Sequence, residues 1–201
     1  MSDLLPSFRP LLESDFDAIY PIEQAAHQEP WSQANLLSCF GPRYLNGLML
    51  VEGRPAGFYI SDLVAGDSSL MNICVHPEFQ GKGLGRELLK EYLARSKGKG
   101  AEAWFLEVRA GNRTAISLYE SEGFAEYCRR ADYYGTGQDR EDAVLMSRLF
   151  DFGCSRSRPA WAGRPSTTDK GACRPLVALC IPAPHSPLRA GTHCRWRDPP
   201  G

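Results

Sequence analysis

One segment constrains the fold more than any other, the glycine-rich run Gln80-Gly81-Lys82-Gly83-Leu84-Gly85-Arg86. Residues 69–75 before it are typical of a strand, and residues 84–98 after it repeat leucines at helical spacing. Glycines at such a turn let backbone N–H groups approach an anion, and the helix N-terminus adds partial positive charge. We therefore expect a phosphate-binding loop, with an ordinary helix-entry turn as the alternative.

Two other phosphate-binding loops are excluded by the residues at the end of this run. A P-loop ends in Gly-Lys followed by Ser or Thr, which is not the sequence here. The dinucleotide fingerprint needs a glycine at the position of Arg86. The loop thus belongs to neither a P-loop NTPase nor a dinucleotide-binding domain.

Segments of strand and helix character alternate through residues 1–150. Strands are expected around 8–11 and at 45–51, 56–64, 69–75, 101–109, 124–129 and 143–149. Helices are expected after Ser14, after Trp31-Ser32, over 84–98 and from Asn112, a plausible N-cap, to Glu120. The turn sequence at 52–55 predicts an antiparallel hairpin. The fold class is α/β, sandwich-like, with a mixed sheet of about seven strands and about four helices.

Residues 151–201 differ in composition from the rest of the chain. They hold eight of the fifteen prolines and four of the seven cysteines, and no periodicity runs through them. Their eight Lys/Arg and three Asp give +5, so the total of −1 leaves −6 for residues 1–150. We predict one folded domain over 1–150 and a disordered Pro/Arg/Cys-rich tail over 151–201.

Two alternatives stay open for the tail. It is basic enough to contact RNA, although no direct nucleic-acid partner is expected for the protein. It also contains a set of possible metal ligands, but their spacing matches no familiar zinc pattern, so no metal cofactor is expected. That set is Cys173, Cys180, His185, His193 and Cys194.

The N-terminal sequence and the hydropathy pattern bear on location. MSDLLPSFRP lacks the basic region and apolar stretch of a signal peptide, and no apolar run approaches the length of a membrane span. We expect a cytoplasmic protein without a membrane partner.

Motifs beyond the glycine run share order and spacing with one enzyme family. Gln-x-x-Gly-x-Gly after Val-His-Pro resembles the acetyl-CoA pyrophosphate motif of GNAT acetyltransferases, and the match to RimI enzymes covers nearly all of residues 8–149. The resemblance implies a GNAT fold and acetyl-CoA as co-substrate. The further matching segments are Glu23-Gln24, Pro30-Trp31-Ser32, Arg43-Tyr44-Leu45-Asn46, Leu106-Glu107-Val108-Arg109, Asn112, Ala115-Ile116, Leu118-Tyr119-Glu120-Ser121, Gly123-Phe124, Tyr133-Tyr134 and Arg140-Glu141-Asp142-Ala143.

The same resemblance implies two catalytic residues. Glu107 would act as the general base and Tyr119 as the general acid that protonates the departing thiolate. Glu107 lies in an otherwise apolar strand, where partial burial raises the pKa of a carboxyl group. The structural alternatives are an ion pair between Glu107 and Arg109 and a core position for Tyr119.

The coenzyme contacts follow from the resemblance as well. Ile73 and Val75 would offer backbone hydrogen bonds to the pantetheine arm, Gly81, Lys82, Gly83, Leu84, Gly85 and Arg86 would bind the pyrophosphate, and Asn112 would contact the coenzyme. Cys74 lies between the two backbone contacts. A ping-pong mechanism through Cys74 is the alternative to direct transfer in a ternary complex, which we favour because buried cysteines are usually inert.

The acceptor implied by the resemblance is the N-terminal alanine of a small-subunit ribosomal protein. Acidic residues in 1–150 would attract a basic peptide, and Tyr133, Tyr134 and Asp142 are expected to shape its groove. Lysine side chains, small amines and a noncatalytic acetyl-CoA-binding module remain alternatives. One departure from the family pattern is Gly111, where serine is common, and it should add flexibility before the helix cap.

Overall fold

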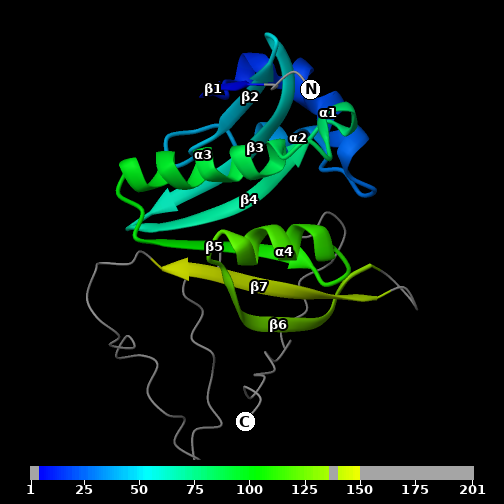
Figure 1. Cartoon of the computed structure of the whole chain (residues 1–201), viewed down its shortest axis with the longest axis vertical. Helices are drawn as coiled ribbons and strands as arrows, with labels where there is room; N and C mark the ends of the chain where they lie inside the picture. Colours follow the sequence, from blue (N-terminus) through cyan, green and yellow to red (C-terminus); the bar gives the residue numbers. More distant parts are fainter. Residues whose placement is uncertain (1–4, 136–139, 150–201) are drawn as a thin grey trace, which may run out of the picture.

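The computed structural model describes residues 5–135 and 140–149 of the chain. In this part, seven strands form one sheet and four α-helices pack against it (Figure 1). The strands are β1 (Pro6–Pro10), β2 (Gly47–Val51), β3 (Arg54–Val64), β4 (Asp67–Val75), β5 (Ala103–Arg109), β6 (Ala125–Tyr134) and β7 (Glu141–Leu149). The helices are α1 (Phe16–Ala26), α2 (Gln33–Leu37), α3 (Leu84–Gly98) and α4 (Arg113–Ser121), with 3-10 turns at Glu13–Asp15 and Pro77–Phe79. The predicted mixed sheet and fold class are confirmed.

The strand order is β1-β2-β3-β4-β5-β7-β6, and all neighbours are antiparallel except β4 and β5. The predicted hairpin joins β2 to β3. The parallel pairing of β4 with β5 is short, from Asp67↔Ala103 to Leu70↔Leu106. Beyond Leu70 and Leu106 the two strands continue without pairing, which opens the sheet in its middle.

Period-2 alternation of the strands supplies a core on each face of the sheet. On one face, Met49, Tyr59 and Trp104 pack against Leu88 and Leu89 of α3. On the other face, a second core forms under α1 and α2 (Figure 1). Its buried members are Leu11, Ile19, Ile22, Leu36, Cys39, Leu48, Phe58, Ile60 and Cys74.

The start of α1 differs from the prediction, because Ser14 does not cap it. Residues Glu13–Asp15 form a 3-10 turn, and α1 begins at Phe16. The carboxylate of Asp15 accepts a 3.0 Å hydrogen bond from the Leu12 N–H and pairs with Arg9 at 2.6 Å. Asp15 therefore fixes the chain before the helix, and Ser14 lies inside the turn.

Strand β6 is longer than predicted and ends at Tyr134, past the expected limit at residue 129. Its pairing with β7 shifts register between Arg130 and Tyr134, and Asp132 has a φ of 54°. Next to this irregularity, the Tyr134 hydroxyl reaches Glu107 of β5 at 2.8 Å. The predicted tail, 151–201, lies outside the described residues.

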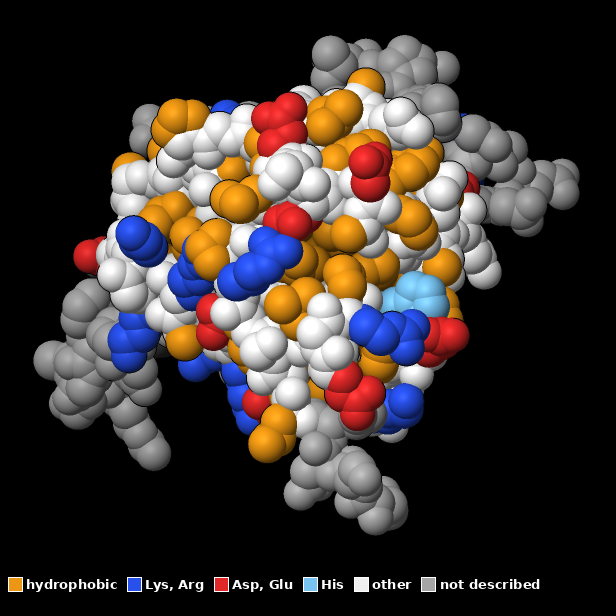
Figure 2. Space-filling model, turned by 90° about the horizontal axis from the view of Figure 1, so that it is seen from above, with side chains coloured by type: hydrophobic (Ala, Val, Ile, Leu, Met, Phe, Trp, Pro, Cys, Tyr) orange, Lys and Arg blue, Asp and Glu red, His pale blue; other side chains and the backbone are white. Residues whose placement is uncertain are grey.

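Two further observations concern the surface charges and the hydropathy of the helices. Lys and Arg side chains lie between Asp and Glu side chains, with hydrophobic groups among them, on the face seen from above (Figure 2). Among the described residues, no helix is both long enough and apolar enough to span a membrane.

Candidate active site

A cavity of about 560 Å³ lies where β4 and β5 separate. Residues Leu70–Ile73 of β4 form one wall and Leu106–Arg109 of β5 form the opposite wall. The end of β6, helix α4 with its N-cap residue, and residues of α1 and of the segment that follows it complete the cavity. Because the gap interrupts the sheet, side chains from both faces reach the same space. The sequence motifs on β5 and α4 are thereby brought together.

Glu107 and Tyr119 both line this cavity, and they come from opposite faces of the sheet. Leu106 and Val108 belong to the core under α3 and α4, so Glu107 between them faces the α1 side. Tyr119 lies on α4 and belongs to the α3 and α4 core. The predicted base and the predicted acid thus line the same cavity, Glu107 from the α1 face of the sheet and Tyr119 from the α3 and α4 face.

Glu107 is held by two residues of β6. Its Oε1 accepts a 2.8 Å hydrogen bond from the Tyr134 hydroxyl, and its Oε2 lies 2.9 Å from the Arg130 guanidinium. Burial raises the pKa of Glu107 above its ordinary value, although the Tyr134 hydrogen bond and the Arg130 charge act in the opposite direction. Glu107 is a partly exposed carboxyl group with a raised pKa, as a general base requires.

The expected alternative partner of Glu107, Arg109, is engaged elsewhere. Arg109 pairs with Glu29, and with Glu141 at 3.3 Å, while its guanidinium lies 4.4 Å from the centre of the Tyr134 ring. The ion pair proposed within the strand is therefore wrong. Arg130, which supplies the positive charge instead, lies on a strand separated from β5 by β7.

Tyr119 is buried against Phe124, with ring centres 5.9 Å apart. Burial raises the pKa of Tyr119 to about 12. Among the described residues, no side chain or backbone group hydrogen-bonds to its hydroxyl, and Tyr119 lines the cavity. Tyr119 is thus a core tyrosine whose hydroxyl remains available to a ligand, and it stays protonated at neutral pH.

The predicted phosphate loop is an exposed turn before α3. Gly81 and Gly83 have φ values of 73° and 79°, which lie in the left-handed region that favours glycine, and Gly83 is the N-cap residue of α3. No atom lies within 4 Å of a Cβ added at either position. Lys82 donates a 2.8 Å hydrogen bond to the Glu78 carbonyl, and Arg86 pairs with Glu122. The backbone is therefore open to an anion, whereas both cations already have protein partners.

Along β4, between this loop and the cavity, successive residues direct their backbone N–H and C=O groups alternately toward β3 and away from it. The His76 N–H bonds to the Ala56 carbonyl of β3 at 2.8 Å, so the alternation of an antiparallel pair directs Ile73 and Val75 away from β3. The gap beyond Leu70 leaves β5 unable to pair with them, and Gln80 donates a 2.8 Å hydrogen bond to the Val75 carbonyl. The remaining backbone groups of Ile73 and Val75 face the gap.

The Cys74 side chain lies on the face of the sheet that α1 covers and belongs to the core there. Its thiol is buried and lies 3.8 Å from Oε2 of Glu23. Burial and the neighbouring carboxylate raise its pKa well above the ordinary value. The thiol is thus held in its neutral form, which is a poor nucleophile.

Asn112 caps α4 as expected, because its Oδ1 accepts a 3.1 Å hydrogen bond from the Ala115 N–H. Gly111 before it packs against Glu141, which accepts a hydrogen bond from the Gly111 N–H. A Cβ at Gly111 would lie 2.6 Å from the Glu141 carboxylate. The departure from the family pattern therefore makes room for this carboxylate instead of merely adding flexibility.

The residues expected to shape the acceptor groove are brought to the same region in part. Tyr133 and Tyr134 line the cavity, and their rings pack edge to face with centres 5.1 Å apart. Asp142 accepts a 3.1 Å hydrogen bond from the Asp132 N–H and is not among the cavity-lining residues. It supports the end of β6 and does not face the cavity.

Glu23, which the sequence reasoning gave no role, is fully buried beside the cavity. It accepts hydrogen bonds from the Trp31 N–H at 2.9 Å and from the Asn72 amide at 3.0 Å, and it lies 3.0 Å from His27. Burial alone would raise the pKa of Glu23, but these partners, led by His27, hold it below the ordinary value. A signal was present, because Glu23 follows Ile19 by four residues and therefore lies on the buried face of α1.

Comparison with known proteins identifies the class of protein that this fold and site define. The model of the acetyltransferase (GNAT) family matches residues 5–124, and the chain belongs to that family. It is 44% identical over 134 residues to the [ribosomal protein bS18]-alanine N-acetyltransferase of Escherichia coli, a match that covers 67% of this chain and 90% of the relative. The expected resemblance to RimI enzymes is confirmed, and the protein is an N-acetyltransferase.

Two solved structures share this fold. The crystal structure of the E. coli ribosomal-protein-S18-alanine N-acetyltransferase has a TM-score of 0.71 and 39% identity, and the match covers 77% of this chain and 99% of that chain. YncA from Salmonella typhimurium, solved with its cofactor acetyl-CoA, has a TM-score of 0.63 and 21% identity, over 77% of this chain and 98% of that one. The second likeness shows the shared fold alone.

Proposed function

We propose that this acetyltransferase transfers the acetyl group of acetyl-CoA to the N-terminal α-amine of a protein, and that the acceptor is the N-terminal alanine of ribosomal protein bS18. The observation that carries the proposal is the cavity between β4 and β5, which Glu107 and Tyr119 enter from opposite sides of the sheet. The names of the similar relatives support the choice of acceptor.

The residues present fit acetyl-CoA. The open backbone of Gly81 and Gly83 before α3 suits a pyrophosphate, and the free backbone groups of Ile73 and Val75 suit the amides of a pantetheine arm. This path runs along β4 from the loop to the cavity, where Asn112 lies. When bound, acetyl-CoA supplies a thioester carbonyl that is open to attack by an amine.

Glu107 takes up the proton that the acceptor nitrogen must lose when it bonds to the acetyl carbon. Tyr119, protonated at neutral pH, donates a proton to the sulfur as the carbon–sulfur bond breaks. Two groups with pKa values raised by burial, one acid and one base, thus serve the two proton transfers.

Direct transfer from the coenzyme to the amine in a ternary complex is part of the proposal. The alternative acyl carrier, Cys74, points into the core under α1 and keeps its proton. The reaction as written needs no metal ion. A cytoplasmic location, as the bS18 acceptor requires, belongs to the same proposal.

The aromatic pair Tyr133 and Tyr134 supports a peptide acceptor, because it extends the cavity along β6 beyond Glu107. Lysine side chains and small amines remain the competing acceptors, since a fold and a coenzyme site do not set the acceptor. A noncatalytic acetyl-CoA-binding module is the other competitor. Product analysis separates these possibilities.

The test measures release of the free CoA thiol by the full chain with acetyl-CoA and a hexapeptide that begins with alanine. Controls are the same peptide with a blocked N-terminus, a lysine-containing blocked peptide and a polyamine. We expect turnover only with the free N-terminus. Turnover with only the lysine peptide or only the polyamine would show that the acceptor is a side-chain or small amine. Binding of acetyl-CoA without any turnover would show that the protein is a noncatalytic acetyl-CoA-binding module.

The role of Glu107 is tested in the same assay. Glu107→Gln should lower kcat by about 10²- to 10⁴-fold, the range for loss of a general base. Glu126→Gln is the matched control, because Glu126 pairs with Arg129 on β6 outside the cavity. Wild-type kcat in Glu107→Gln would remove Glu107 from the mechanism.

A further inference from the structure

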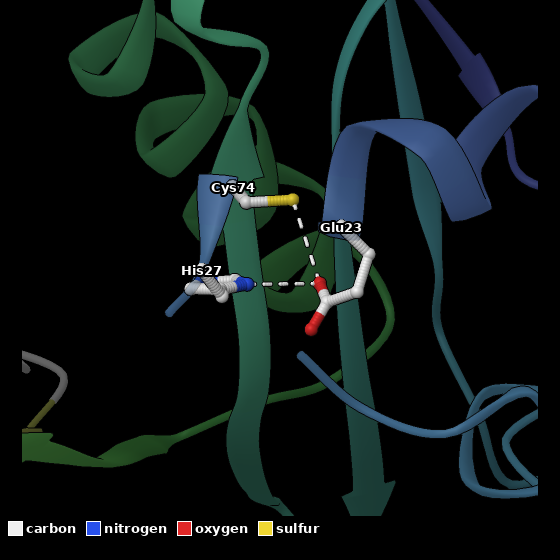
Figure 3. Close-up of side chains that lie close together, drawn as sticks. All are labelled: Glu23, His27 and Cys74. Atoms are coloured by element: carbon white, nitrogen blue, oxygen red, sulfur yellow. Dashed lines mark hydrogen bonds and ion pairs between the residues drawn. The ribbon is translucent and has the colours of Figure 1, made fainter. Parts of the chain in front are cut away.

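Three potential metal ligands converge beside the cavity, outside the groups that the proposed reaction uses. They are Glu23 and His27 from α1 and its end, and Cys74 from β4, and one ligand atom from each lies within 4.8 Å of the others (Figure 3). Oε2 of Glu23 is central, 3.0 Å from Nδ1 of His27 and 3.8 Å from Sγ of Cys74. We propose that these residues form a binding site for a divalent cation of borderline softness such as Zn²⁺.

The spacing of the atoms fits such an ion. Zn²⁺ binds nitrogen, oxygen and sulfur at about 2.0 to 2.3 Å, so that tetrahedral ligands lie roughly 3.3 to 3.8 Å from one another. The Glu23–Cys74 separation of 3.8 Å lies at the upper end of this range and the Glu23–His27 separation of 3.0 Å just below it, while all three ligand atoms lie within 4.8 Å of one another. Carboxylate, imidazole and thiolate are all ligands that zinc accepts, and replacing the thiol proton by the ion would make the buried cluster electrically neutral.

A buried amide provides a second, independent observation. Asn72 is 8% exposed, and its Nδ2 donates to Oε2 of Glu23 at 3.0 Å, whereas its Oδ1 has no hydrogen-bond partner. Rotation of the amide would turn Oδ1 toward Glu23, where it completes a four-coordinate site. An orphaned buried acceptor beside three ligands is what a missing cation would satisfy.

The site also has an entry path. The His27 side chain is 36% exposed although its Nδ1 is buried, and Glu23, His27 and Asn72 all line the cavity, so an ion approaches the ligands from the cavity. Trp31 N–H bonds to Oε1 of Glu23, and Oε2, which accepts from Asn72 Nδ2 in this structure, becomes free for the ion once the amide rotates. A bound ion would tie the end of α1 to β4 in the cavity wall.

Titration of the metal-free full chain with Co²⁺ tests the site, because a cobalt–thiolate bond gives a charge-transfer absorption band. Residues 151–201 hold four of the seven cysteines, which are potential Co²⁺ ligands, so the quantity of interest is the difference between variants that share them. We expect Cys74→Ser to bind one equivalent of Co²⁺ fewer than the wild type and to lose the corresponding part of the band. Zn²⁺ should displace Co²⁺ from the wild type.

Two further variants complete the test, one as a second ligand substitution and one as a control. His27→Gln changes a partly exposed ligand and should lose the same equivalent, which covers the case in which Cys74→Ser fails to fold. Cys39→Ser is the matched control, because Cys39 is also a buried free thiol but belongs to no cluster of metal-ligating groups in the described residues. Equal Co²⁺ binding and equal band intensity in the wild type and in His27→Gln would overturn the proposal.

Discussion

The Tyr134 hydroxyl donates a 2.8 Å hydrogen bond to Oε1 of Glu107, across the strand that separates β6 from β5. This bond lowers the pKa of Glu107, against the burial that raises it. The bond depends on the irregular end of β6, because the register shift after Arg130 brings Tyr134 to the cavity. The pairing of β6 thus adjusts the pKa of the proposed base.

Tyr134→Phe should therefore move the pH profile. Without the hydrogen bond, the pKa of Glu107 rises further, so less carboxylate is present at a given acidic pH. The limb of kcat that reflects deprotonation of Glu107 should shift to higher pH, as measured with the alanine hexapeptide. Tyr127→Phe, on the same strand but 38% exposed and outside the cavity, should leave it in place. An unmoved limb in Tyr134→Phe would contradict this account of Glu107.

Tyr119→Phe separates catalysis from stability. The hydroxyl has no hydrogen-bond partner among the described residues, so its removal should leave the free energy of unfolding nearly unchanged. Loss of the general acid should lower kcat by about 10²- to 10⁴-fold. Tyr92→Phe should behave in the opposite way, because the Tyr92 hydroxyl bonds to Ser68 at 2.9 Å in the core and its loss costs about 1 kcal/mol. Urea unfolding and initial rates measure both effects, and a stability loss in Tyr119→Phe without a rate loss would reverse the assignment.

Gly83→Ala tests the phosphate loop. Alanine in the left-handed region costs about 1 to 2 kcal/mol, and the strained loop should also raise the KM for acetyl-CoA. Gly98→Ala is the control, because Gly98 is the last residue of α3, has open space around it, and alanine favours helix. If the KM for acetyl-CoA is the same in both variants, the loop does not bind the coenzyme.

Ser96→Ala should destabilise the protein without affecting the site. The buried Ser96 hydroxyl donates to the Tyr92 carbonyl at 2.6 Å and accepts from the Trp104 indole at 2.7 Å. Alanine leaves the buried indole N–H without a partner, at a cost of about 1 to 3 kcal/mol. Urea unfolding measures the loss, with Ser38→Ala on the surface as control, and kcat at a permissive temperature should match the wild type. An unchanged midpoint would show that another group satisfies the indole.

Local sequence patterns predicted the strands, the glycine loop and the Asn112 cap, because each depends on residues close together in the chain. Local sequence patterns could not predict the partners of Glu107. Arg130 is 23 residues from Glu107 in the chain, and its side chain reaches Glu107 across β7, which lies between β5 and β6. The motif match supplied the candidate residues of the site, whereas long-range strand order determines which charges surround them.

Glu23 shows the same limit within a helix. Its spacing from Ile19 indicated a buried position, but the reason for its burial lies in Asn72 and Cys74 on β4, about fifty residues away in the sequence. A sequence pattern marks a polar residue on an apolar face without naming the groups that satisfy it. Those groups became visible only when α1 was seen to pack on β4.

The short parallel ladder between β4 and β5 has a mechanical consequence. Within the described residues, strands β1–β4 and strands β5–β7 meet only along the pairs from Asp67↔Ala103 to Leu70↔Leu106, so the sheet consists of two plates joined at one corner. A small rotation about that corner changes the separation of Ile73 and Val108 more than that of Asp67 and Ala103. A coenzyme that lies along β4 in the opening would act as a spacer between the plates, taking the place of the strand pairing that the sheet lacks there.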